Sequence, residues 1–134
     1  MTSKILYTGD LRSEAIHLRS QTLIETDAPV DNNGKGERFS PTDLVATALG
    51  SCMITLMAMK ATDMRIELKG TTAEITKIMA ADPRRISKII VTIHVPKLDL
   101  DEKQQKILIH TAQTCPVAKS IHPDIEVDCS IQFE

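Results

Sequence analysis

The stretch SPTDLVATALGSCMITLMAM, residues 40–59, predicts a long buried helix. Ser40 is a favourable N-cap, Pro41 suits the first helical position, and Asp43 places a carboxylate in the first turn. From Leu44 to Met59 the apolar residues surround the helix instead of forming one stripe. Such a helix must be covered on nearly all sides, and a chain this small has few other elements to cover it. We therefore expect a partner subunit to supply part of the cover.

The segments on either side of this helix predict the fold class. Alternating or β-branched runs bounded by turn residues predict strands around residues 4–9, 14–19, 22–27, 71–80, 86–95 and 125–134. A second helix is expected from Asp99, as N-cap, to the break at Pro116, with a short further turn to Ile121. The resulting order, βββ-α-ββ-α-β, is that of an α+β fold with helices on antiparallel sheet, and residues 1–134 fit a single domain.

The composition argues against several classes of function. The net charge is −2, and the aromatic residues are limited to Tyr7, Phe39 and Phe133, so a nucleic-acid-binding protein is not expected. The first residues lack the apolar core of a signal peptide, and the uncharged run 44–59 is short and rich in Thr, Ser and Gly for a membrane span. We expect a cytoplasmic protein that binds neither nucleic acid nor membrane.

The histidines and cysteines do not predict a metal site. Histidines 17, 94, 110 and 122 lack ligand spacing, and no Cys-x-x-Cys pair occurs. We expect no metal and no other cofactor.

The three cysteines differ in their surroundings. Cys129 occupies an inward position of the regularly alternating last strand, where a free cysteine packs as a small hydrophobe. Cys52 lies within the apolar helix, so it is either core packing or a thiol in an apolar pocket. Because burial disfavours a thiolate, a reactive Cys52 would need a nearby cation and an opening to solvent. Cys115, at the helix break before Pro116, has the local freedom that disulfide formation requires.

Two segments together resemble the OsmC/Ohr family (osmotically inducible protein C and organic hydroperoxide resistance protein). FSPTDLVATALGSCMITLM, residues 39–57, is similar to the family's Asn-Pro-Glu-x-Leu motif, small-residue helix and cysteine. AQTCPVAKSIHPDIEVDCSIQF, residues 112–133, is similar to its Cys-Pro-Val motif and terminal strand. The order and spacing of the two segments also fit, so the resemblance covers nearly the whole chain.

The resemblance implies an intertwined homodimer and a thiol peroxidase. Cys52 matches the peroxidatic cysteine, which forms a sulfenic acid with an organic hydroperoxide, and Cys115 matches the resolving cysteine, which forms a disulfide with it. An external dithiol, lipoyl-based in the family, would then reduce the disulfide.

The resemblance also implies an arginine that activates the thiol. Arg12 matches the position used in the hydroperoxide-resistance branch, and Arg38 the position used in the osmotic-stress branch. The family's motif glutamate, which holds the arginine, is replaced here by Thr42, so Asp43 and Glu37 are the candidate supporting acids.

A second function class stays open on the sequence. A dimeric stress protein of the same fold, which binds a small apolar or thiol-containing ligand without catalysis, would also retain the apolar helix and both cysteines. Loss of thiols on treatment with an organic hydroperoxide would distinguish the peroxidase from the binding protein.

Overall fold

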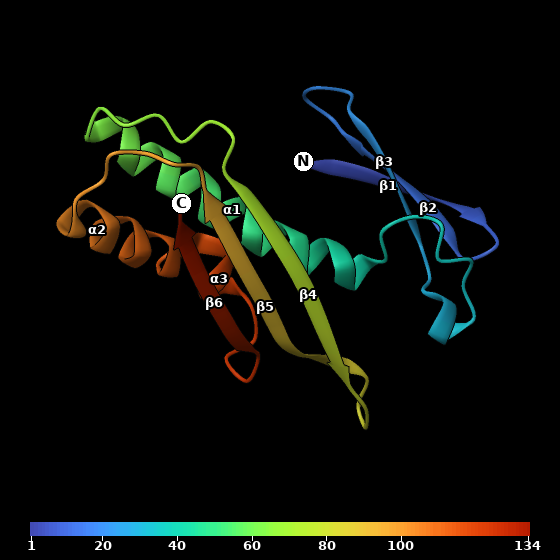
Figure 1. Cartoon of the computed structure of the whole chain (residues 1–134). Helices are drawn as coiled ribbons and strands as arrows, with labels where there is room; N and C mark the ends of the chain where they lie inside the picture. Colours follow the sequence, from blue (N-terminus) through green and yellow to red (C-terminus); the bar gives the residue numbers. More distant parts are fainter. The chain divides into compact units, whose positions relative to one another are not determined.

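The computed structural model describes residues 1–134 and contains the expected order of elements (Figure 1). The strands and helices are β1 (Ser3–Gly9), β2 (Arg12–His17), β3 (Leu23–Asp27), the 3-10 helix η1 (Val30–Asn32), α1 (Pro41–Asp63), β4 (Thr72–Ala80), β5 (Arg85–Val95), α2 (Glu102–Gln113), α3 (Pro116–Ser120) and β6 (Glu126–Phe133). The chain divides into two compact units, Met1–Val45 and Ala46–Glu134. The single domain over residues 1–134 stays a prediction.

The first unit is built on a three-stranded antiparallel sheet of order β1-β2-β3. The turn between β1 and β2 has two residues with positive φ, Asp10 at 54° and Leu11 at 60°, as a tight hairpin requires. The second hairpin places Arg12 of β2 opposite Asp27 of β3. The three predicted N-terminal strands are confirmed.

Helix α1 begins with the predicted cap. The Asp43 N–H donates to Ser40 Oγ at 3.0 Å, and the Ser40 N–H donates to Asp43 Oδ2 at 2.9 Å. This reciprocal pair is a capping box, which satisfies two backbone donors at the helix start. The helix continues to Asp63, one turn beyond the predicted apolar run.

One face of α1 forms the centre of the second unit. Its fully or nearly fully buried residues recur at helical spacing and pack with β5 and α2: Ala46, Leu49, Met53, Met57 and Ala61 with Ile89, Val91, Ile93, Val95, Leu108 and Ala112. Gly50 lies on the same face, and a Cβ there would come 2.4 Å from Ile75 Cδ1, so its lack of a side chain lets β4 approach the helix.

The opposite face of α1 is not covered by its own unit. Val45 and Met59 are 39% and 59% exposed. The helix is also long and apolar enough to cross a membrane by length and composition, in contrast to the expectation from residues 44–59, although core helices pass the same test. Cover of this face by a partner subunit stays a prediction.

The sheet of the second unit has the order β4-β5-β6 and is mixed. Strands β4 and β5 pair antiparallel, but β6 pairs parallel to β5, with Cys129 opposite Val91. The chain leaves β5, crosses through α2 and α3, and returns in the same direction, which is how parallel neighbours are connected. The expectation of a wholly antiparallel sheet was therefore wrong at this last strand.

Helix α2 starts two residues later than predicted. Its N-cap is Asp101 and not Asp99: the Gln104 N–H donates to Asp101 Oδ1 at 2.8 Å, and the Asp101 N–H donates to Gln104 Oε1 at 3.0 Å. Both aspartates have a capping-box partner three positions on, Glu102 for Asp99 and Gln104 for Asp101, so the pattern allows either start. The hydrogen bonds of Asp101 and Gln104 place the start at Asp101. The predicted short turn after Pro116 is confirmed as α3.

Candidate active site

Cys52 lies on α1, close to the buried face of the helix. Its side chain is partly exposed, and it packs against the core together with the partly buried Leu56. The neighbouring Met53 is almost completely buried. Cys52 is thus a thiol with an apolar environment and some access to solvent. The sequence alone had left open whether it is core packing or a thiol in an apolar pocket.

Cys115 is fully buried at the junction of α2 and α3. It is the N-cap of α3, where its Sγ accepts a hydrogen bond from the Ala118 N–H at 3.3 Å, and Pro116 takes the first helical position. Burial raises the pKa of the Cys115 thiol; the Ala118 N–H acts in the opposite direction, and a hydrogen bond with Cys52 adds to the increase. The structure therefore brings the two cysteines into contact, although 63 positions (115 − 52) separate them in the chain.

The two thiols differ in a way that bears on their chemistry. Cys52 is accessible to a small molecule, whereas Cys115 has no exposed surface and is held in the protonated form by its burial. An oxidant that enters from solvent would meet Cys52 first.

Cys129 lies on the inward face of β6, as predicted. It is partly buried against the core, and burial raises the pKa of its thiol, with smaller contributions from Asp128 and from Cys115. It is packed with the core and lies near enough to Cys115 for their charges to interact.

The first unit contains a cluster of two arginines and three acids. Arg12 donates from Nε to Asp27 Oδ1 at 2.6 Å and from Nη2 to Asp27 Oδ2 at 2.8 Å, which is a bidentate pair. Asp27 is 1% exposed, and its carboxylate also accepts from the Glu37 N–H at 3.1 Å. The hydrogen bonds from Arg12 lower the pKa of Asp27 to about 2, and the same pair raises the pKa of Arg12.

The second candidate arginine is held less firmly. Arg38 Nε lies 3.6 Å from Glu25 Oε1, and its Nη1 donates to the carbonyl of Glu37 at 3.0 Å. The Arg38 side chain is 43% exposed, against 23% for Arg12. Arg12 is therefore the better oriented of the two guanidinium groups.

The candidate supporting acids have different environments. Glu37 Oε1 lies 3.6 Å from Arg12 Nη2, whereas the Asp43 carboxylate caps α1 through the Ser40 N–H. The acid that makes the shortest contacts with Arg12 is Asp27, which sequence reasoning missed. Arg12 and Asp27 lie opposite each other at the open end of the β2–β3 hairpin, so their side chains share one face, but the predicted strand 14–19 did not include Arg12 and the pair was not predicted.

The comparisons with known proteins agree with this architecture. The family described as OsmC-like protein matches residues 34–130. The chain belongs to the OsmC-like family. The family expected from the two cysteine segments is therefore confirmed.

Solved structures of OsmC-like proteins share the fold. A crystal structure from Psychrobacter arcticus, named for an osmotic stress induced and detoxification response, is 61% identical, with a TM-score of 0.94 over 98% of this chain and 96% of that one. An organic hydroperoxide resistance protein OsmC from Legionella pneumophila is 19% identical, with a TM-score of 0.72 over 98% of this chain and 97% of that one. An organic hydroperoxide resistance protein from Elizabethkingia anophelis is 16% identical, with a TM-score of 0.76 over 100% of this chain and 97% of that one. Curated proteins gave no match.

Proposed function

We propose that this OsmC-like protein is a thiol peroxidase that reduces organic hydroperoxides. The contact between the partly exposed Cys52 and the fully buried Cys115 carries the proposal. Two thiols of different accessibility, held in contact by separate helices, are what a peroxidatic and resolving pair requires. Membership of the OsmC-like family supports the same assignment.

The first step oxidises Cys52. Its thiolate attacks the terminal oxygen of the hydroperoxide, the O–O bond breaks, and the leaving alkoxide takes a proton to become an alcohol. The sulfur gains one oxygen and becomes a sulfenic acid. The hydroperoxide is reduced by two electrons, and Cys52 is oxidised by two.

The second step forms a disulfide. The Cys115 sulfur attacks the sulfenic sulfur of Cys52, an S–S bond forms, and the hydroxyl leaves as water with the Cys115 proton. An external dithiol then restores both thiols by two exchange reactions and is itself oxidised to a disulfide. The net reaction converts a hydroperoxide and a dithiol into an alcohol, water and a disulfide.

The surroundings of Cys52 favour an organic substrate. Leu56, one turn after Cys52 on α1, is only partly buried, so an alkyl chain gains apolar contacts there that hydrogen peroxide cannot make. As part of the same proposal, the protein is a homodimer, and an external dithiol reduces its disulfide.

We assign the activation of Cys52 to a guanidinium, with Arg12 as the first candidate and Arg38 as the second. A guanidinium stays charged at all relevant pH values and donates several hydrogen bonds, so it favours a thiolate. The bidentate pair with Asp27 supports Arg12, because it fixes the orientation of the group. In this assignment Asp27 is a positioning residue.

Thiol titration tests the proposal directly. Reduced protein treated with one equivalent of tert-butyl hydroperoxide is expected to lose two titratable thiols per chain, while one equivalent of hydrogen peroxide acts more slowly. Peptide mapping should then find Cys52 joined to Cys115, with Cys129 still free. Unchanged thiols would reject the peroxidase in favour of the dimeric binding protein.

A further inference from the structure

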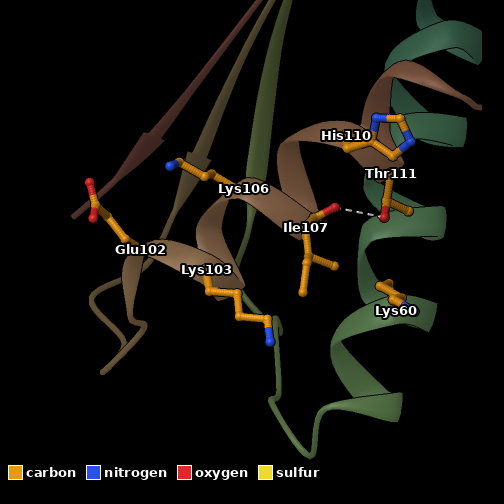
Figure 2. A pocket seen from close by; sticks show the side chains of 7 residues that line it. All are labelled: Lys60, Glu102, Lys103, Lys106, Ile107, His110 and Thr111. Carbon is orange, nitrogen blue, oxygen red and sulfur yellow. Dashed lines mark hydrogen bonds between the residues drawn. The ribbon is translucent and has the colours of Figure 1, made fainter.

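A charged hollow of the second unit lies between α1 and α2, and neither Cys52 nor Cys115 lines it. It has a volume of about 780 Å³ and is lined by Lys60, Glu102, Lys103, Lys106, Ile107, His110 and Thr111. Figure 2 shows Lys60 of α1 facing Lys103 and Ile107 of α2 across this groove. We call it the lysine groove.

The charges of the lysine groove are unbalanced. Three lysines face one glutamate, in a chain whose net charge is −2. The lysine side chains are exposed, and none of the three forms an ion pair within the protein. Elsewhere on this unit a partly buried lysine does pair with acids: Lys88 lies 3.8 Å from Glu126 and 3.5 Å from Asp128. A positive potential is thus concentrated over one groove of an acidic protein.

The lysine groove also has an apolar floor. Ile107 and Thr111 line the groove together with the charged side chains. The Thr111 hydroxyl donates a hydrogen bond to the Ile107 carbonyl at 2.8 Å, so it is already satisfied within the helix. An occupant therefore meets cations at the rim and hydrocarbon at the centre. This distribution of polarity is typical of protein docking surfaces.

The spacing of the cations selects the kind of occupant. Lys103 and Lys106 are three residues (106 − 103) apart on α2, which is roughly 4.5 Å along the helix, and Lys60 lines the groove from α1. The three lysines come from two helices, so an occupant with several carboxylates can meet more of them than a single anion can. Several carboxylates on one segment, such as glutamates at i and i+4 of a helix, match the spacing. A flat membrane surface would not reach the floor of a groove.

The position of the lysine groove relates it to the thiols. Cys52 precedes Lys60 by eight residues (60 − 52) on α1, which is roughly 12 Å, and Cys115 follows Thr111 by four (115 − 111) beyond α2. A protein held in the groove would thus be close to Cys52 on α1 and to Cys115 just beyond the end of α2.

We propose that the lysine groove docks an acidic segment of the partner protein that carries the reducing dithiol. The identity of the partner rests on the proposed function, while the preference for an acidic segment rests on the groove alone. Docking through separated charges raises the association rate and leaves the thiols free to react.

Peptide binding tests the groove without any catalysis. A fluorescent peptide with glutamates at i and i+4 is expected to bind the full-length protein, and its glutamine counterpart is not. Binding should weaken steeply between about 0.01 M and about 1 M salt, because the Debye length falls from about 30 Å to about 3 Å. Lys103→Glu with Lys106→Glu should weaken it about tenfold, and so should Lys60→Glu on the opposite wall.

The matched control is Lys69→Glu with Lys97→Glu, two exposed lysines of the same unit outside the groove. This control should bind like the wild type, and circular dichroism should show that every variant is folded. Equal loss of peptide binding in the control, or no loss of binding in Lys60→Glu, would overturn the assignment of the lysine groove as the binding site. Competition by inorganic phosphate, equal binding to anionic vesicles, or an altered oligomeric state in the groove variants would also overturn it, in favour of a small anion, a membrane or a second copy.

Turnover tests the identity of the partner. With an acidic lipoyl-bearing domain as reductant, the groove variants should raise KM about tenfold, while turnover with dithiothreitol stays at the wild-type rate. An unchanged KM would reject the dithiol carrier as the occupant. If the wild type has no turnover even with dithiothreitol, the proposed peroxidase fails, and the peptide experiment still decides whether the groove binds acidic segments.

Discussion

At the scale of single residues, Cys52 and Cys115 have separable roles. Cys52→Ser removes the accessible nucleophile, so peroxide consumption should fall to the background rate. Cys115→Ser keeps the first oxidation but removes the group that resolves it, so a sulfenic acid should accumulate at Cys52. Dimedone labelling and mass spectrometry measure this species. Continued turnover in Cys52→Ser, with no sulfenic acid in Cys115→Ser, would mean that the two roles are assigned wrongly.

The two arginines are distinguished by the rate at which Cys52 is alkylated. In a Cys115→Ser, Cys129→Ser background only Cys52 can react, so iodoacetamide consumption against pH reports its thiolate. Arg12→Met keeps much of the side-chain volume and removes the charge, and should move the alkylation profile toward higher pH. Arg38→Met is the matched control and should leave the profile in place. If neither substitution moves it, arginine activation is rejected.

Asp27 predicts a specific dependence of stability on pH. Its pKa is about 2 in the folded chain, below the ordinary value of 3.8, so the paired carboxylate stabilises the fold above about pH 4. This contribution is lost as the pH falls from about 4 toward about 2, because the folded state must then take up a proton. Asp27→Asn should be less stable than the wild type at neutral pH, with a difference that shrinks over this interval. Urea unfolding at several pH values measures it, and a constant difference would contradict the assignment.

At the scale of elements, the start of α2 offers a paired test. Asp101→Ala removes both an acceptor for the Gln104 N–H and half of the capping box, and should lower the free energy of unfolding by about 1 kcal/mol. Asp99→Ala is the control two residues earlier and should change it by much less. Equal effects of the two substitutions in chemical denaturation would show that the cap does not stabilise the helix in solution.

The elements that the sequence predicted well are those with local causes. Strand alternation in 86–95 and 125–134, and the Ser40-Pro41-x-Asp43 start of α1, depend on neighbouring residues and were confirmed. The parallel direction of β6 depends on the path of the whole α2–α3 connection, which no local pattern records. The local pattern could not choose between Asp99 and Asp101, because each has a suitable capping-box partner three residues on, Glu102 and Gln104.

The residues of the candidate site also fall into two groups, those that the sequence indicated and those that it did not. Family resemblance identified Cys52 and Cys115, and the contact between them agrees with that assignment. Asp27 escaped notice because its role depends on hairpin register and burial, and an aspartate at a strand end reads in sequence as a turn residue. The lysine groove escaped notice for a related reason: Lys60 and Lys103 are remote in the chain, and an exposed lysine on one helix is ordinary.

At the scale of the whole molecule, much apolar surface is left uncovered by a single chain. On β1, Ile5, Leu6 and Tyr7 are 68%, 62% and 64% exposed, and they are consecutive, so both faces of the first sheet present apolar side chains. A hollow of about 250 Å³ on this sheet is lined by four apolar residues and two charged ones: Ile5, Leu6, Ile16 and Leu23 with Lys4 and Glu14. Exposed apolar surface of this extent marks an interaction site. Together with the open face of α1, it supports the predicted homodimer.

The dimer should be obligate, because a chain that buries its apolar surface only in the assembly gains stability from association. The melting temperature should then rise with protein concentration, since mass action favours the folded dimer. Leu6→Glu places a charge on the exposed apolar strand and should shift sedimentation toward smaller species, with loss of folded structure at low concentration. Arg19→Glu, a charge change at an exposed residue between β2 and β3 that does not line this hollow, is the control and should sediment as the wild type does. A folded monomer that persists at micromolar concentration, with a melting temperature independent of concentration, would contradict the obligate dimer and leave the exposed strand without an explanation.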